Sequence, residues 1–176
     1  MSAEIRYDAS DFWRLSDAFA RLPAEIRAKV TARAMARVAD MGRTRVVRRI
    51  AERVDLPPGI VRDNTHAYVD AQGAVIRVKT NWISLYRIGA RQTRSGVTVR
   101  ARGSYKSAFI ATMNGGTAVF KREDGAGRFP VTALYGPNPA HDIRTSPQVY
   151  QDLMNELAEK VVMPRLLHEL GRILPK

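Results

Sequence analysis

The turn Leu56-Pro57-Pro58-Gly59 divides this 176-residue chain into two segments with different hydrophobic periods. Before the turn, apolar residues recur in steps of about four from Ile26 to Val54, which predicts a long helix over residues 24–54. Beyond His66 the period becomes two, as strands require. Because proline lacks an amide hydrogen, neither pattern continues through the turn. The order of helix, strands and helix favours an α+β fold, with terminal helices packed on a central antiparallel sheet.

The helical parts have further expected boundaries. A short helix is expected over residues 8–19, and a turn or short helix over residues 59–63. A strict step of four drifts around a 3.6-residue turn, so the stripe of helix 24–54 winds and Gly42 is the expected point of a bend. Ser146-Pro147 starts a C-terminal helix with serine as its cap, and Pro164 should kink or split that helix.

The strands show hairpin signals. Asn114-Gly115 favours a two-residue type I′ turn, and it places Phe109 opposite Phe120, Ile110 opposite Val119 and Thr112 opposite Thr117. Further predicted strands are residues 68–71 paired with 74–79, residues 82–88, and residues 96–102 with Arg100 and Arg102 facing outward. Residues 136–139, with two prolines and a glycine, are expected to be irregular. We therefore expect one domain over residues 1–176, helical over 1–56, with a sheet over 66–135 and a C-terminal helix over 146–174.

The charge of the chain is strongly positive: it has 29 Lys and Arg residues and 17 Asp and Glu residues, a formal net charge of +12. Such a field attracts polyanions, nucleic acid first among them, although acidic protein neighbours satisfy it equally well. The absence of cysteine excludes disulfides and thiolate metal sites. No apolar run approaches the length that a membrane span needs, and the N-terminus lacks a secretion signal, so we expect no membrane partner.

Catalytic chemistry is not indicated. The histidines His66, His141 and His168 lie far apart, without metal-ligand spacing, so no metal site is predicted. His141-Asp142 is expected to be an exposed loop pair rather than a base with its orienting acid. Gly125-Ala126-Gly127 lacks the lysine and the strand–loop–helix setting of a phosphate loop. We therefore predict no enzyme, no catalytic residue and no cofactor.

Basic residues without an intervening acid occupy the stretch from Arg87 to Lys106. A continuous basic surface without base-reading side chains suits sequence-independent contact with phosphates, and acidic patches on adjacent subunits are the alternative. The arginines of helix 24–54 spread around its circumference, which favours a solvated or partner-facing helix over one that reads a DNA groove. The DNA-facing candidates are Arg77, Lys79, Arg87, Arg91, Arg94, Arg100, Arg102 and Lys106.

Several blocks of this stretch resemble the prophage minor tail protein Z family. They include Arg87-Ile88-Gly89-Ala90-Arg91-Gln92-Thr93, Gly96-Val97-Thr98-Val99, Ala108-Phe109-Ile110-Ala111-Thr112-Met113, Val119-Phe120-Lys121-Arg122, Arg128-Phe129-Pro130-Val131 and Leu134-Tyr135-Gly136-Pro137. The arginine-rich helix before Leu56-Pro57 is also similar. The sequence departs from the family pattern at residues 114–118 and at Asn138-Pro139, in expected loops, which leaves partner specificity open.

The resemblance implies a tail-completion protein of a long-tailed phage or prophage-like particle, without catalytic residues. It implies a homo-oligomeric ring, hexameric by matching tail symmetry, that contacts the tail terminator, tail tube and head–tail connector proteins. The basic candidates then face the lumen and genomic DNA, after assembly in the host cytoplasm. The apolar helix stripes supply the subunit-interface candidates Val46, Ile50, Val54, Leu166, Leu170 and Ile173.

Three other functions stay open. A tail terminator or a head-side stopper ring has the same kind of sequence. A free, sequence-independent DNA-binding protein predicts affinity for duplex DNA with a steep dependence on salt. A small basic nuclease or toxin requires a metal cluster or a histidine-centred site, which the sequence does not indicate.

Overall fold

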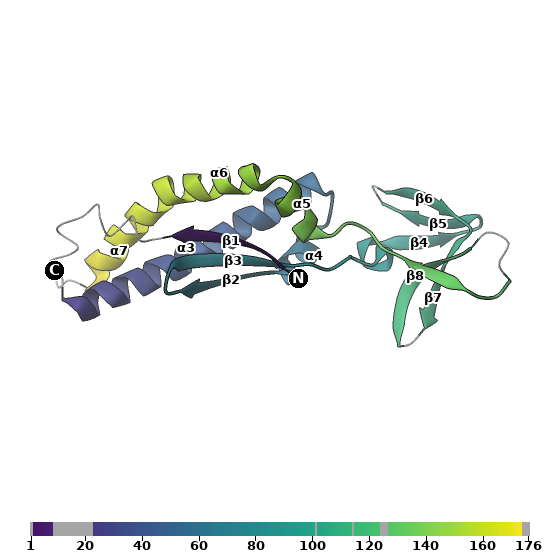
Figure 1. The fold of residues 1–176 in the computed structure, drawn as a ribbon, viewed down its shortest axis with the longest axis horizontal. Helices are drawn as coiled ribbons and strands as arrows, with labels where there is room; N and C mark the ends of the chain where they lie inside the picture. The colour runs from purple at the N-terminus through teal and green to yellow at the C-terminus, as the bar shows by residue number, and fades with distance from the viewer. Residues whose placement is uncertain (1, 9–22, 101, 114, 124–126, 174–176) are drawn as a thin grey trace.

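The computed structural model describes residues 2–8, 23–100, 102–113, 115–123 and 127–173. Helix α3 (Ala24–Arg53) is the central element of one half of an elongated molecule (Figure 1). It packs against an antiparallel sheet of order β1-β3-β2, formed by β1 (Ser2–Asp8), β3 (Gly73–Lys79) and β2 (Thr65–Asp70). It also contacts the C-terminal helices, so α3 is covered by two layers.

The long helix and its apolar stripe are confirmed. α3 begins after Pro23 and ends at Arg53, within one residue of the predicted bounds. The stripe that includes Val30, Val46 and Ile50 is buried, and a second row next to it is buried too. The helix runs on through Gly42, where an added Cβ would lie 2.7 Å from Ile76 Cδ1 of β3. The missing side chain thus lets the sheet approach the helix.

The first hairpin and the short helix after the proline turn are also confirmed. α4 (Pro58–Asp63) follows the turn, and β2 pairs with β3 in antiparallel register. Residues 1–56 were expected to be helical, but Ser2–Asp8 is a strand that pairs with the other edge of β3, Ile5 opposite Ile76. That pairing joins segments about 70 residues apart, which local periodicity does not reveal. The expected helix over residues 8–19 lies almost wholly outside the described residues.

The other half of the molecule holds two small antiparallel sheets instead of a continuation of one central sheet. The first has the order β4-β5-β6, with β4 (Ala90–Thr93), β5 (Gly96–Val99) and β6 (Gly103–Lys106). The second has the order β7-β8-β9, with β7 (Ala108–Met113), β8 (Gly116–Arg122) and β9 (Val131–Leu134). The predicted strand at 82–88 was wrong, because residues 85–88 form the 3-10 helix η1 (Leu85–Ile88).

The predicted register of the β7–β8 hairpin is confirmed at all three pairs. Phe109 lies opposite Phe120 with ring centroids 6.1 Å apart, and Ile110 lies opposite Val119. The hydroxyls of Thr112 and Thr117 are 2.8 Å apart. The two strands therefore pair like with like along the ladder.

The C-terminal helix is split, as Pro164 predicted. α6 (Pro147–Leu157) passes through the π-helical segment η2 (Ala158–Val162) into α7 (Met163–Ile173). Proline at the second position of α7 cannot donate an amide hydrogen, so the ladder is interrupted just before it. Ser146 precedes α6, but its hydroxyl accepts a hydrogen bond from Arg53 instead of capping the helix.

Residues 136–139 are not wholly irregular, because α5 (Pro139–Thr145) begins at Pro139 with Asn138 as its cap. The Asn138 side chain accepts a hydrogen bond from the amide of Ala140 at 3.1 Å.

The two halves meet at the junction, residues 80–84 and 135–137, where Ser84 and Tyr135 form an isolated β-bridge. Buried apolar residues form one connected core through both halves. Among the described residues, no helix has both the length and the apolar character needed to cross a membrane.

Candidate functional site

The outward face of the β4-β5-β6 sheet carries an exposed basic surface. Antiparallel register places Arg91 opposite Thr98 and Lys106 opposite Gly96, which puts both cations on the face away from buried Val97. Arg94 lies in the β4–β5 turn and Arg100 follows β5, and both are exposed. We call Arg91, Arg94, Arg100 and Lys106 the distal basic face. None of the four has an acidic partner among the described residues, so their charge is available to a ligand.

The side-chain amide of Gln92, an exposed residue, fixes this sheet to its neighbour. Gln92 of β4 donates from Nε2 to the carbonyl of Gly96 at 2.9 Å. Its Oε1 accepts the amide hydrogen of Ile110 from β7 at 2.8 Å. Gln92 therefore connects the two distal sheets, a role that sequence reasoning missed because a single glutamine has no pattern of its own.

Arg102 does not belong to the distal basic face. The strand was expected to reach residue 102, but β5 ends at Val99, and Arg102 turns back toward α3. Its guanidinium donates to the carbonyls of Val54 and Asp55 at the C-terminal end of α3. The last carbonyls of a helix lack intrahelical donors, so Arg102 serves as a distant cap.

Two more predicted cations are held in ion pairs. Arg77 of β3 lies 2.7 Å from the Glu4 carboxylate and 5.4 Å from the Tyr68 ring centroid. The hydrogen bond to Glu4 and its charge raise the pKa of Arg77. Arg87 of η1 lies 3.2 Å from Asp63 of α4.

Lys79 is exposed at the end of β3, on the helical half. The eight predicted cations therefore do not form one surface. Four of them make up the distal basic face. Arg77 and Lys79 lie on β3 of the helical half, Arg87 lies on η1 and pairs with Asp63, and Arg102 contacts the end of α3.

The interface candidates lie mostly inside the chain itself. Val46, Ile50 and Leu166 are fully buried in the core between α3, the sheet and the C-terminal helices. Val54, Leu170 and Ile173 are half-buried against the same core. Val46, Ile50 and Leu166 therefore offer no spare apolar surface, whereas Val54, Leu170 and Ile173 keep part of theirs and Leu167 of α7 is 62% exposed.

His141-Asp142 lies on α5 rather than in an exposed loop. The Asp142 carboxylate accepts hydrogen bonds from Arg53 Nε at 2.8 Å and from the Tyr150 hydroxyl. Burial, and then the hydrogen bond to Asp142, raise the pKa of Tyr150. The network joins α3, α5 and α6, and His141 stays exposed outside it. Across the described ranges, no three histidine or acidic side chains gather closely enough to hold a metal ion.

Comparison with known proteins gives one family. The family model described as prophage minor tail protein Z (GPZ) matches residues 17–175, nearly the whole chain. No curated protein and no solved structure matches it. The match includes the distal basic face and all of the helices described above. The chain therefore belongs to the prophage minor tail protein Z family, which gives it a structural role in a phage tail.

Proposed function

We propose that the protein is a non-enzymatic tail-completion component that forms a homo-oligomeric, hexameric ring at the head-proximal end of the tail. In this role it contacts the tail terminator, tail tube and head–tail connector proteins. The ring leaves a channel for genomic DNA, and the distal basic face lines that channel. The protein is made in the host cytoplasm and ends in the virion neck.

The distal basic face is the observation that carries this proposal. Its four cations are exposed and lack acidic partners in the described part of the chain. Lysine and arginine side chains in this state neutralise phosphates without reading bases. The two hydroxyls on the same face, Thr98 and Ser104, bond each other at 3.2 Å, which leaves little capacity to read a base edge. Contact of this kind tolerates any genome sequence, as a DNA channel must.

The shape of the subunit suits a ring. The distal sheets occupy one end of the long axis, and α7 and the start of α3 occupy the other (Figure 1). A subunit of this form reaches radially from an outer wall into a lumen. The distal basic face then meets DNA, while the helical half meets other proteins.

Exposed aromatic residues at the junction supply the surface for contact with a second copy. Trp82 is 65% exposed and Tyr135 is 57% exposed, and both line a hollow of about 510 Å³. The hydroxyls of Thr80 and Ser84, in the same hollow, are buried without a hydrogen-bond partner among the described residues. Tryptophan and tyrosine dominate binding energy in protein interfaces, and buried unpaired hydroxyls favour a polar partner. We assign this hollow to the neighbouring subunit of the ring.

A cryo-electron microscopy reconstruction of the assembled particle tests the proposal. We expect a ring of this chain between the tail tube and the head, with Arg91, Arg94, Arg100 and Lys106 toward the lumen. A ring with these four residues on its outer wall contradicts the DNA-facing role. Particles that lack the chain contradict the whole proposal.

A further inference from the structure

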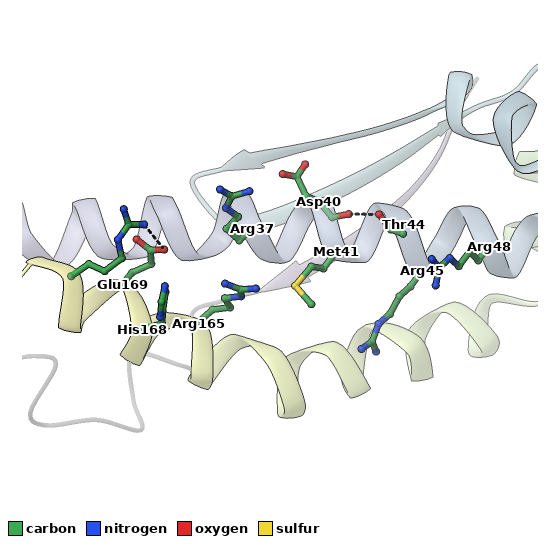
Figure 2. A pocket seen from close by; sticks show the side chains of 10 residues that line it. Arg37, Asp40, Met41, Thr44, Arg45, Arg48, Arg165, His168 and Glu169 are labelled. Atoms are coloured by element: carbon green, nitrogen blue, oxygen red, sulfur yellow. Dashed lines mark hydrogen bonds and ion pairs between the residues drawn. The ribbon is translucent and has the colours of Figure 1, made fainter.

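A second basic site lies between α3 and α7, far from the distal basic face (Figure 2). It is a pocket of about 450 Å³, within the size range of sites that hold small ligands or short peptide segments. Figure 2 shows Met41 and Arg45 of α3 and Arg165 and His168 of α7 pointing into the space between the helices. We call it the arginine pocket, and its arginine lining is Arg37, Arg45, Arg48, Arg165 and Arg172, with His168 between the last two.

The pocket contains a buried carboxylate, Glu169, one oxygen of which lacks a hydrogen-bond donor among the described residues. Glu169 is only 4% exposed, and its Oε1 lies 3.8 Å from Arg172. Its Oε2 is buried with no hydrogen-bond partner among the described residues. A buried acceptor without a donor is costly, so native proteins rarely leave one unsatisfied. The unpaired Oε2 therefore marks a place where a ligand donates a hydrogen bond.

Three arginines that line the same pocket are free to bind an anion. Arg37, Arg48 and Arg165 have no hydrogen-bond or ion-pair partner in the part of the chain that the structure describes. Arg45 lies 3.6 Å from Glu156, in a half-exposed pair that contributes little. The planar guanidinium fork matches carboxylates and phosphates in two-point contacts. The pocket thus offers several anion sites beside one acceptor.

The mixture of charges favours a polypeptide over nucleic acid. A nucleic-acid backbone carries a negative charge at every step, and the carboxylates of Asp40 and Glu169 in this pocket repel it. An acidic polypeptide carries carboxylates for the arginines and backbone N–H groups for Glu169. A second hollow of about 390 Å³ shares Arg45 and Arg48 and runs between α3 and α6. An extended chain can therefore follow α3 beyond the pocket.

We propose that the arginine pocket binds an acidic segment of another protein. Carboxylates of that segment bind Arg37, Arg48 and Arg165, and one of its backbone amides donates to Glu169 Oε2. The identity of the partner as a neighbouring tail or neck protein rests on the proposed function, whereas the binding chemistry does not.

Binding of a fluorescein-labelled peptide of alternating glutamate and glycine to the full chain tests this inference. Fluorescence anisotropy at low salt should show affinity that falls at least about tenfold in the double variant Arg37→Ala/Arg165→Ala. The matched control Arg33→Ala/Arg144→Ala removes the same charge at exposed sites outside the pocket, and it should stay within about twofold of the wild type. Equal losses in the two variants indicate general charge attraction and overturn the proposal.

A second variant separates a loss of binding from misfolding of the alanine variant. Arg37→Lys/Arg165→Lys keeps both charges but loses the planar forks, so it should retain the fold and still bind the peptide more weakly than the wild type. Duplex DNA is the competitor. If DNA displaces the peptide, and its own binding depends on Arg37 and Arg165, the pocket binds phosphate and the proposal is wrong.

The outcome is separable from that of the proposed function. If peptide binding depends on the pocket but the chain is absent from assembled particles, the pocket proposal holds and the neck role is wrong. If the chain is present in the neck but its pocket variants bind the peptide as the wild type does, the neck role holds and the pocket proposal is wrong. Each proposal can therefore fail alone.

Discussion

Arg102 donates hydrogen bonds from its guanidinium to the backbone carbonyl of Val54, and so ties the segment after β5 to the C-terminal end of α3. The contact joins the distal sheets to the helical half across 48 residues of sequence. A cation at this end of a helix also interacts favourably with the helix dipole. Arg102 thus helps to set the position of the distal basic face relative to the long helix.

Replacement of Arg102 by alanine should lower the free energy of unfolding by about 1–3 kcal/mol, because the carbonyls of Val54 and Asp55 lose a charged donor. Urea denaturation followed by circular dichroism measures the change. Arg100→Ala is the control. Arg100 is exposed and two residues away, so its replacement should change the free energy of unfolding by no more than about 0.5 kcal/mol. Equal stability of the two variants contradicts the capping role.

The β7–β8 turn should tolerate alanine at Gly116 and not at Gly115. Gly115 has a φ of +78°, a left-handed conformation that costs an L-residue about 1–2 kcal/mol. Gly116 has ordinary φ and open space around its Cα, so it serves as the matched control. In thermal unfolding, the melting temperature of Gly115→Ala should be lower than that of the wild type, and that of Gly116→Ala should be close to it. The reverse order contradicts the turn geometry.

The features that could be predicted from the sequence are those set by neighbouring residues. The Asn-Gly turn fixes which residues face each other, so the pairs of Phe109 with Phe120 and Thr112 with Thr117 followed from the sequence. The prolines likewise marked where α3 gives way to α4 and where the C-terminal helix is split.

Contacts between distant segments could not be predicted in the same way. The pairing of β1 with β3 and the turn of Arg102 toward Val54 leave no periodic signal in the sequence. An apolar stripe also looks the same whether it faces the chain's own core or another subunit. Val46 and Ile50 were therefore assigned to an interface, although the sheet and the C-terminal helices cover them. The arginine pocket was missed for a similar reason, since Arg37 and Arg165 meet only in the fold.

The stability of the protein should fall as pH rises above about 10, in part because of Tyr150. Burial and the hydrogen bond to Asp142 raise the pKa of Tyr150 above its ordinary value of 10.0. Tyrosine that is neutral in the folded protein ionises more readily in the unfolded chain, so its contribution is complete below pH 10 and is lost progressively above it. Unfolding free energies between pH 8 and pH 11 should decline less steeply in Tyr150→Phe. Tyr135→Phe removes an exposed tyrosine and should keep the wild-type slope; equal slopes in wild type and Tyr150→Phe contradict the assignment.

Loss of the distal basic face should weaken binding to duplex DNA and flatten its salt dependence. Each phosphate contact contributes about 0.9 to the slope of log K against log salt, so alanine at Arg91, Arg94, Arg100 and Lys106 should reduce the slope by up to about 3–4. The control variant carries alanine at Lys29, Arg33, Arg62 and Arg144, which are exposed on the helical half. Fluorescence anisotropy across a salt series measures both slopes. An equal change in the two variants means that net charge alone governs binding.

Removal of the Trp82 side chain should prevent incorporation into particles without unfolding the subunit. Trp82 is 65% exposed, so alanine there leaves the core intact, while the proposed contact with a second copy loses its largest apolar group. We expect at least about a tenfold drop in copies per purified particle, measured by quantitative mass spectrometry, with an unchanged melting temperature. Phe129→Ala is the matched control, because Phe129 is 64% exposed and lies outside the junction. Normal incorporation of Trp82→Ala, or an equal drop in both variants, removes the junction from the subunit interface.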